Sequence, residues 1–365
     1  MRMGLTFDDV CLVPQYNNVV SRGDPVLKTW LTSNIETELP LIPSNMNTVI
    51  GHELAGALQP HGGDVIDHRF HTYDSLHPEI AAEHLASRVY KFGRPICISW
   101  GLQDKATLDA LLKWGTDSHI WGVCFDVAHG HCEGMFEIMD WTRANYPDVE
   151  IIAGNVCTQL GYQELVSHGA TAVKVGVGCG AACTTRMVTG FGLPQFTAIR
   201  DCAELAKKLR VPIIADGGIR NSRDIILALA AGASTVMMGK MFAACTESAA
   251  EKYELRTAPV YSQFADISAR GNQPYDPPRY RAKYRGQASF DFQQEFYGKV
   301  RHAPEGESMW IPVSGPVDTM IDQLTKQIKA GLTYAGATSI AELQRKAEFI
   351  QVTHNYFKES GIRPL

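Results

Sequence analysis

Short runs of apolar residues recur along the chain, and turn residues bound each of them. Eight such runs cover residues 39–43, 63–67, 95–99, 120–127, 150–156, 171–178, 211–218 and 234–239. They are continuous rather than alternating, which indicates strands buried on both faces, as in a parallel sheet. Segments with helical spacing separate several of them, and the one at 222–233 follows a capping residue, Asn221.

Eight strands separated mostly by helices predict a (β/α)8 barrel, with an open doubly wound sheet as the alternative. The polar residues favour the barrel, because they fall at the carboxyl ends of nearly all the runs. They are Ser44-Asn45, Asp67-His68-Arg69, Ser99, Asp126, Asn155, Gly176, Asp216 and Gly239. Active sites of such barrels lie at that end of the strands. We therefore expect one barrel domain over residues 1–365, with no inserted regulatory domain pair.

The region 250–310 departs from this pattern. It is rich in Pro, Arg, Tyr and Gly and has neither helical nor strand periodicity. Long segments of this kind in compact domains are commonly active-site lids or disordered loops. We expect an irregular lid or flap inserted after the eighth strand, followed by helices over 312–350 that pack on the outside of the barrel.

Composition limits the classes of function. The 365 residues are 45% hydrophobic and 20% charged, with a net charge of −5 and no block of Lys and Arg, so we expect no nucleic-acid partner. No apolar run approaches the length of a membrane span, and no signal peptide is recognisable. The nine cysteines are scattered and contain no CxxC pair, which favours reduced thiols and a cytoplasmic location.

Two glycine turns, "IADGGIRNSRD" (214–224) and "MMGK" (237–240), end the seventh and eighth runs. In barrels these two loops often form a phosphate site, because glycine lets backbone N–H groups approach an anion. The alternative is a tight turn that needs glycine for its backbone angles alone. Asp216 is better suited to a sugar hydroxyl than to phosphate, since carboxylate and phosphate repel.

The stretch "KVGVGCGAACTTRMVTG" (174–190) raises three hypotheses for Cys183: a small buried residue, a metal ligand together with Cys179, or a nucleophile. The surrounding glycines and the position at a strand end favour the nucleophile, whose reactive form is the thiolate. In "CFDVAHGHCE" (124–133), a zinc site is the alternative to Asp126 contacting ribose hydroxyls. Arg285, Arg301 and Glu305 are either lid residues or part of a solvated loop.

Seven motifs together resemble the IMP dehydrogenase/GMP reductase family, from about Leu5 to Thr353. They are "LTFDDVCLVPQ", "SNMNTV", "FDVAHGH", "AGNV", "KVGVGCGAACTTRMVTGFGLPQ", "IADGGI" and "YAGATSIAEL". The resemblance implies a (β/α)8 barrel, usually in a homotetramer. It also implies a shared chemistry, in which a cysteine thiolate adds to carbon 2 of a purine nucleotide and hydride moves between that carbon and a nicotinamide.

Three features favour the reductase branch. There is no room for an inserted pair of regulatory domains between "DHRF" and "RPICIS". The segment "FDFQQEFYGK" lacks the Arg-Tyr pair of the dehydrogenase flap. The sequence of the flap segment resembles that of one group of bacterial reductases. We therefore predict an NADPH-dependent GMP reductase that forms IMP and ammonia. The alternatives are an NAD-dependent IMP dehydrogenase, a nucleotide-binding member without turnover, and an FMN-dependent barrel oxidoreductase that does not need Cys183.

The resemblance also assigns roles. Cys183 is the nucleophile, and Thr185 with Glu305 handles the proton. The implied substrate contacts are Asp216, Gly217, Gly218, Gly239, Lys240, Gly286, Gln287, Ser289 and Arg301; the implied cofactor contacts are Ser99, Asp126, Ala128, His129, Gly130 and Asn155; and the carbonyls of Gly178, Gly180 and Cys183 match a potassium loop. The chain departs from the family at Ala181 (usually Ser), Cys179 (usually Pro) and Asn47 (usually Asp). Lys240, where dehydrogenases typically have Ser, is predicted to pair with the phosphate.

Overall fold

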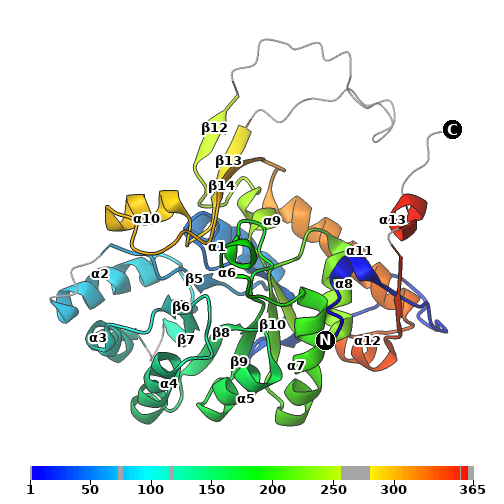
Figure 1. The fold of residues 1–365 in the computed structure, drawn as a ribbon, viewed down its shortest axis with the longest axis horizontal. Coiled ribbons are helices and arrows are strands. Elements are labelled where there is room, and N and C mark those ends of the chain that lie inside the picture. The colour runs from blue at the N-terminus through cyan, green and yellow to red at the C-terminus, as the bar shows by residue number, and fades with distance from the viewer. Residues whose placement is uncertain (1, 73–76, 116–118, 256–279, 354, 361–365) are drawn as a thin grey trace.

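The computed structural model describes residues 2–72, 77–115, 119–255, 280–353 and 355–360. Its centre is a sheet of eight parallel strands: β4 (Leu41–Pro43), β5 (Ile66–Asp67), β6 (Ile96–Trp100), β7 (Ile120–Asp126), β8 (Glu150–Val156), β9 (Ala172–Val175), β10 (Ile213–Asp216) and β11 (Thr235–Met238). Hydrogen bonds join them in the order β4-β11-β10-β9-β8-β7-β6-β5. The sheet curls into a nearly closed barrel with helices around it (Figure 1). The predicted (β/α)8 barrel is confirmed, and each predicted apolar run contains one strand.

Helices follow most of these strands and cover the outside of the barrel (Figure 1). They are α1 (His52–Leu58), α2 (Pro78–Tyr90), α3 (Lys105–Gly115), α4 (Glu133–Asn145), α5 (Gln159–Ser167), α7 (Gln195–Leu209) and α8 (Ser222–Ala231). Two further short helices, α6 (Thr185–Thr189) and α9 (Lys240–Ala243), lie in the connections after β9 and β11, at the carboxyl ends of the strands. Short 3-10 helices lie at Phe7–Asp9 and Gln59–His61. Asn221 caps α8 as expected, because its side chain accepts the backbone N–H of Asp224.

The core has two layers. Inside the barrel, one fully buried side chain comes from each strand: Ile42, Ile66, Cys97, Cys124, Ile152, Ala172, Ile214 and Met237. Leu31 joins this layer from the hairpin of β2 (Thr29–Trp30) and β3 (Glu36–Thr37). A larger apolar cluster fills the space between the sheet and the surrounding helices. Because the middle of the barrel is filled, ligands can enter only from its ends.

The region 250–310 is more regular than predicted. Its described residues form an antiparallel sheet of β12 (Lys252–Glu254), β13 (Tyr280–Arg285) and β14 (Ser308–Pro312), with α10 (Phe290–Tyr297) between the last two strands. The prediction of an irregular segment is wrong for these residues, while 256–279 lie outside the described part of the chain. These strands were not predicted because the apolar pattern of β13 is short: Ala282 and Tyr284 are buried, but charged residues stand beside them. In addition, Ile311, which pairs with Ala282, is distant in sequence.

The C-terminal part matches its prediction. Helices α11 (Val317–Tyr334) and α12 (Ile340–Lys346) pack on α8 outside the barrel, and α13 covers Asn355–Ser360. The strands β1 (Val10–Leu12) and β15 (Phe349–Gln351) pair antiparallel and bring the two ends of the described chain together. None of the described helices has the length and apolar character needed to cross a membrane.

We expect the substitution Ile152→Ala to lower the free energy of unfolding by about 2–5 kcal/mol, because it leaves a cavity in the filled interior of the barrel. Chemical denaturation followed by circular dichroism measures this change. Leu160→Ala on α5 is a matched control, since Leu160 is 58% exposed, and it should leave stability nearly unchanged. Equal losses for the two variants would contradict this description of the core.

Candidate active site

A cavity of about 470 Å³ opens at the carboxyl ends of the barrel strands. Its lining includes polar or glycine residues at or just after six of the strands: Ser44 and Asn45, Arg69, Asp126, Asn155, Asp216 and Gly239. The rest of the wall comes from the loop that carries Cys183 and from several residues between Tyr284 and Glu305, in the segment that follows β11. This is the end of the barrel at which the sequence predicted a site.

A buried lysine organises the floor of this cavity. Lys174 in β9 is 1% exposed, and its Nζ lies 2.7 Å from Asp126 Oδ1 and 3.1 Å from Asp216 Oδ2. It also donates to Asn45 Oδ1 at 3.3 Å. Asn45 in turn donates to Asp126 Oδ2 at 2.9 Å and to Ser99 Oγ at 2.7 Å. The ion pairs and the hydrogen bonds of the Asn45 amide therefore connect five strands into one polar network above the apolar interior.

The charges of this network are held in place by one another. Burial alone would lower the pKa of Lys174, but Asp126 and Asp216 outweigh burial and raise it. Burial would raise the pKa of Asp126, but the charge of Lys174 outweighs it and holds that pKa below its usual value. Lys174 is therefore a fixed cation, and Asp126 is an ionised hydrogen-bond acceptor at neutral pH.

Asn155 at the end of β8 provides a free acceptor in the cavity. Its Nδ2 donates to Gly176 O at 2.8 Å and to Asp216 Oδ2 at 3.0 Å. Its Oδ1 is buried and has no hydrogen-bond partner among the described residues. An unsatisfied buried acceptor is costly, so this oxygen fits a ligand donor such as a ribose hydroxyl or a carboxamide N–H.

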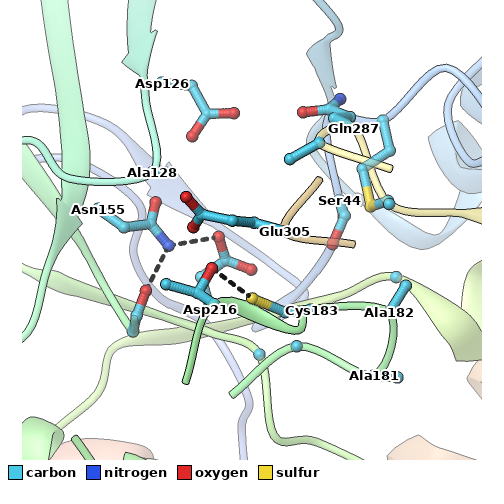
Figure 2. Close-up of a pocket in the computed structure, with 18 of the residues that line it drawn as sticks. Ser44, Asp126, Ala128, Asn155, Ala181, Ala182, Cys183, Asp216, Gln287 and Glu305 are labelled. Atoms are coloured by element: carbon cyan, nitrogen blue, oxygen red, sulfur yellow. Dashed lines mark hydrogen bonds between the residues drawn. The ribbon is translucent and has the colours of Figure 1, made fainter. Parts of the chain in front are cut away.

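The loop after β9 presents Cys183 to the cavity. The loop turns sharply, and Gly176 (φ 151°) and Gly178 (φ 76°) take backbone angles that favour glycine. The backbone N–H of Cys183 donates to Gly180 O at 3.0 Å, and its Sγ–H donates to Thr185 Oγ1 at 3.1 Å. Figure 2 shows Cys183 beside Asp216, with the Glu305 side chain extending across the cavity toward Asp126.

Cys179 in the same loop is a different kind of thiol. Its Sγ donates to Gln195 Oε1 at 3.2 Å and to Asp216 O at 3.3 Å. Burial raises the pKa of Cys179 to about 12. The reactive thiolate is therefore absent from Cys179 at neutral pH, which leaves Cys183 as the candidate nucleophile of this loop.

Backbone hydrogen bonds fasten the excursion 286–307 to the Cys183 loop. Thr184 N donates to Glu305 O at 2.9 Å, and Glu307 N donates to Ala182 O at 2.9 Å. Between them, Cys183 and Gly306 form an antiparallel bridge. This short ladder, and not a flexible contact, sets the position of Glu305 relative to the thiol.

The predicted phosphate side is a wall of glycines. Gly217 (φ 92°) and Gly218 (φ 78°) follow Asp216 in the left-handed region. A Cβ on Gly239 would lie 2.3 Å from the hydroxyl oxygen of Tyr284, so only glycine fits there. Lys240 comes next, lines the cavity and is exposed, and no ion pair to it is found among the described residues. Backbone N–H groups and one free ammonium suit an anion.

Most of the predicted site residues line this one cavity. They are Cys183, Thr185, Glu305, Asp216, Gly217, Gly218, Gly239, Lys240, Gly286, Gln287, Asp126, Ala128, Asn155, Gly178 and Gly180. Their convergence from seven separate segments is the main agreement between sequence and structure. The individual roles that the resemblance gives them stay predictions.

Five predicted contacts lie outside the lining, each for a visible reason. Ser289 is 1% exposed and caps α10, accepting the N–H of Phe292. Arg301 is exposed and its guanidinium lies 4.0 Å from the centre of the Tyr297 ring. Ser99 is buried beneath Asn45, and Gly130 packs against the backbone of β8. His129 is exposed beside the site.

Five residues that line the cavity were not predicted as site residues: Lys174, Arg69, Tyr284, Tyr297 and His302. Lys174 had a signal, since a lysine inside a buried apolar run must have a charged partner. No sequence pattern predicts the positions of Tyr297 and His302, because their segment has no helical or strand periodicity. Arg69 was recorded only as a strand-end residue.

The mouth of the barrel joins a candidate nucleophilic thiol, two carboxylates and a glycine-lined wall that suits an anion. Comparison with known proteins makes this specific. Residues 4–363 match the family described as "IMP dehydrogenase / GMP reductase domain". The chain belongs to that family, which uses a nicotinamide cofactor, and it is an oxidoreductase of purine metabolism.

Three relatives show where in the family the similarity lies. The chain is 31% identical to the inosine-5'-monophosphate dehydrogenase of Borreliella burgdorferi, over 98% of this chain and 96% of the relative. It is 31% identical to the enzyme of that name from Cryptosporidium parvum, over 98% and 94%. It is 40% identical to the one from Chlorobaculum parvum, over 69% of this chain but 49% of the relative, so it spans about half of that protein's length.

The prediction of a GMP reductase is wrong. Each of these relatives is named an inosine-5'-monophosphate dehydrogenase, and two of them are matched over nearly their whole length. The lack of room for an inserted domain pair therefore does not separate the branches, because the Borreliella relative is also compact enough for 96% coverage. The absence of an inserted domain pair and of an Arg-Tyr pair is thus weaker evidence than the identity to dehydrogenases over most of the chain.

We expect Lys174→Met to lower the free energy of unfolding at pH 8 by about 3–5 kcal/mol, because Asp126 and Asp216 become buried carboxylates without a counter-ion. In this variant burial and mutual repulsion raise their folded-state pKa values. A raised carboxyl pKa destabilises the fold as pH rises through it, so the deficit should shrink between pH 8 and pH 5.

Denaturant unfolding of both proteins at the two pH values measures this effect. Lys113→Met removes an exposed ion pair with Asp109 and serves as the control, with stability nearly unchanged at either pH. A Lys174→Met deficit that is the same at pH 5 and pH 8 would argue against charge as its cause.

Proposed function

We propose that this protein is an NAD-dependent IMP dehydrogenase that oxidises IMP to XMP through a covalent bond to Cys183. The observation that carries the proposal is the convergence of Cys183, Thr185 and Glu305 with Asp216 and the glycine wall in one cavity. The names of the relatives support the oxidative direction. Assembly into a homotetramer and a cytoplasmic location stay predictions.

The residues divide the cavity into two sides. On the nucleotide side, Asp216 accepts hydrogen bonds from ribose hydroxyls, while Gly217, Gly218 and Lys240 hold the phosphate. On the other side, Asp126 and the free Oδ1 of Asn155 fit the nicotinamide riboside, so this chain has acceptors where NAD would be held. When bound, NAD supplies the acceptor for hydride.

The first chemical step uses the thiolate of Cys183. Its sulfur adds to carbon 2 of the purine and the electron pair moves to nitrogen 3; the hydride on carbon 2 then leaves with its bonding pair and the C2=N3 double bond forms again. Thr185 accepts the Sγ–H of the resting thiol and so lies where the proton must depart. Glu305, fixed by the backbone ladder to Thr184, is the nearby carboxylate for that proton.

The potassium loop is matched only in part. The carbonyl oxygen of Gly180 accepts the N–H of Cys183, which leaves one of its lone pairs for a cation. Gly178 lines the cavity and its left-handed backbone turns the loop. Potassium at the carbonyls of Gly178, Gly180 and Cys183 stays a prediction of the resemblance.

Purified protein mixed with IMP and NAD should produce NADH and XMP, followed by the absorbance of the reduced nicotinamide and by chromatography. Cys183→Ala should abolish NADH formation while the protein stays folded, because the covalent step is lost. Cys11→Ala, a change in β1 remote from the cavity, should keep wild-type activity. NADH formation by the Cys183→Ala variant, or none by the wild type, would refute the proposal.

Lys240→Ala should raise the KM for IMP by roughly 10–100-fold, because a charge-assisted hydrogen bond contributes about 1.5–3 kcal/mol. The value of kcat should change little, since the ammonium contacts a non-reacting phosphate. Steady-state kinetics with IMP varied at saturating NAD measures both. Lys326→Ala on α11 is the matched control, and an unchanged KM for Lys240→Ala would exclude a phosphate contact.

A further inference from the structure

Oxidation of IMP leaves the purine joined to Cys183, and water must then release it. This second step needs a group that takes a proton from the water as its oxygen bonds to carbon 2. In the dehydrogenases that the chain resembles, an Arg-Tyr pair in the flap activates that water. Here the matching segment is α10, and its sequence "FDFQQEFY" offers no such pair.

The structure shows what α10 does instead. Gln293 is 4% exposed, and its Oε1 accepts the backbone N–H groups of Arg301 (2.8 Å) and His302 (3.0 Å). Its Nε2 donates to His302 O at 3.1 Å. One buried amide therefore holds the backbone of His302 from both sides.

His302 lies at the cavity. It lines the wall together with Ala303 and Glu305. The segment is fixed again at Glu305, whose N–H donates to Ala288 O at 3.0 Å and whose carbonyl accepts Thr184 N. Within the described residues, no side-chain partner of the His302 ring is found. Imidazole is the side chain most often used as a general base in catalysis.

The other ionisable residues of the lining are less suited. Lys174, Asp126 and Asp216 are bound to one another. Burial raises the pKa of Tyr284 above its usual range, so it stays protonated. The guanidinium of Arg69 lies 4.5 Å from the centre of the Phe70 ring, and no tyrosine ring is found against it among the described residues. Thr185 accepts the Sγ–H of Cys183, and Glu305 is the carboxylate assigned to the same proton, so both are already used in the first step.

Resting on the proposed function, we propose that His302 is the general base of the hydrolytic step and that Gln293 is its positioning residue. One proton of the water passes to the imidazole as the oxygen bonds to carbon 2, and the electron pair of C2=N3 moves to nitrogen 3. That pair then re-forms the double bond, the C2–S bond breaks, and its electrons leave on the sulfur of Cys183. The second water proton stays with the product.

The test is rapid mixing of enzyme with IMP and NAD, which separates the two steps. His302→Ala should keep a burst of NADH of about one per active site and then turn over roughly 10²–10⁴-fold more slowly than wild type. Intact-protein mass spectrometry should find the purine adduct on Cys183 accumulated. Added imidazole should restore part of the steady-state rate.

The controls isolate the role of His302. His84→Ala removes an exposed histidine on α2 and should behave as wild type. Gln293→Ala should slow the second step, and combining it with His302→Ala should add little, because both act through the same ring. His302→Gln repeats the test in a side chain of similar size, should the alanine variant fold poorly.

The outcomes are distinguishable. A wild-type steady-state rate in both His302 variants, or loss of the burst in proportion to the later rate, would overturn the inference and leave the proposed function intact. If the wild type forms no NADH from IMP and NAD, the proposed function fails and the inference falls with it.

Discussion

The ammonium of Lys174, between Asp126 and Asp216 at the top of an apolar barrel interior, is the interaction on which the site depends. Asp126 and Asp216 both have an oxygen within 3.1 Å of its Nζ, and two carboxylates this close would otherwise repel. The lysine removes that conflict by forming an ion pair with each of them. The cost of burying its charge is offset by two ion pairs and an amide oxygen.

From that network the two halves of the cavity take their positions. Asp216 is followed directly by the glycine turn on the nucleotide side, while Asp126 is tied through Asn45 to β4 and β6. Asn155 connects the halves, because its amide contacts both Asp216 and the start of the Cys183 loop at Gly176. A change in one acceptor is thereby felt on the other side of the cavity.

The barrel was predictable because each strand is a continuous apolar run, which needs no knowledge of its neighbours. The site was partly predictable for the same reason, since strand-end residues such as Asp126, Asn155 and Asp216 inherit their place from the strand. His302 and Gln293 were not predictable, because hydrogen bonds between α10 and residues 301–302 set their positions, and such bonds produce no periodic pattern in the sequence. Ser289 is the reverse case: a motif predicts it at the ligand, and in the structure its hydroxyl caps the helix that follows it.

The branch of the family was predicted wrongly on a similar ground, since the absence of a motif or domain says little when a compact dehydrogenase relative is matched over 96% of its length.

The ladder between the Cys183 loop and residues 305–307 has a further consequence. The strands β12 and β13 pair with each other, so the ends of the connection between Glu254 and Tyr280 are joined independently of its length. Insertions and deletions there can accumulate among descendants of this gene without changing the register between thiol and carboxylate. The length of this connection and the chemistry at Cys183 can therefore evolve separately.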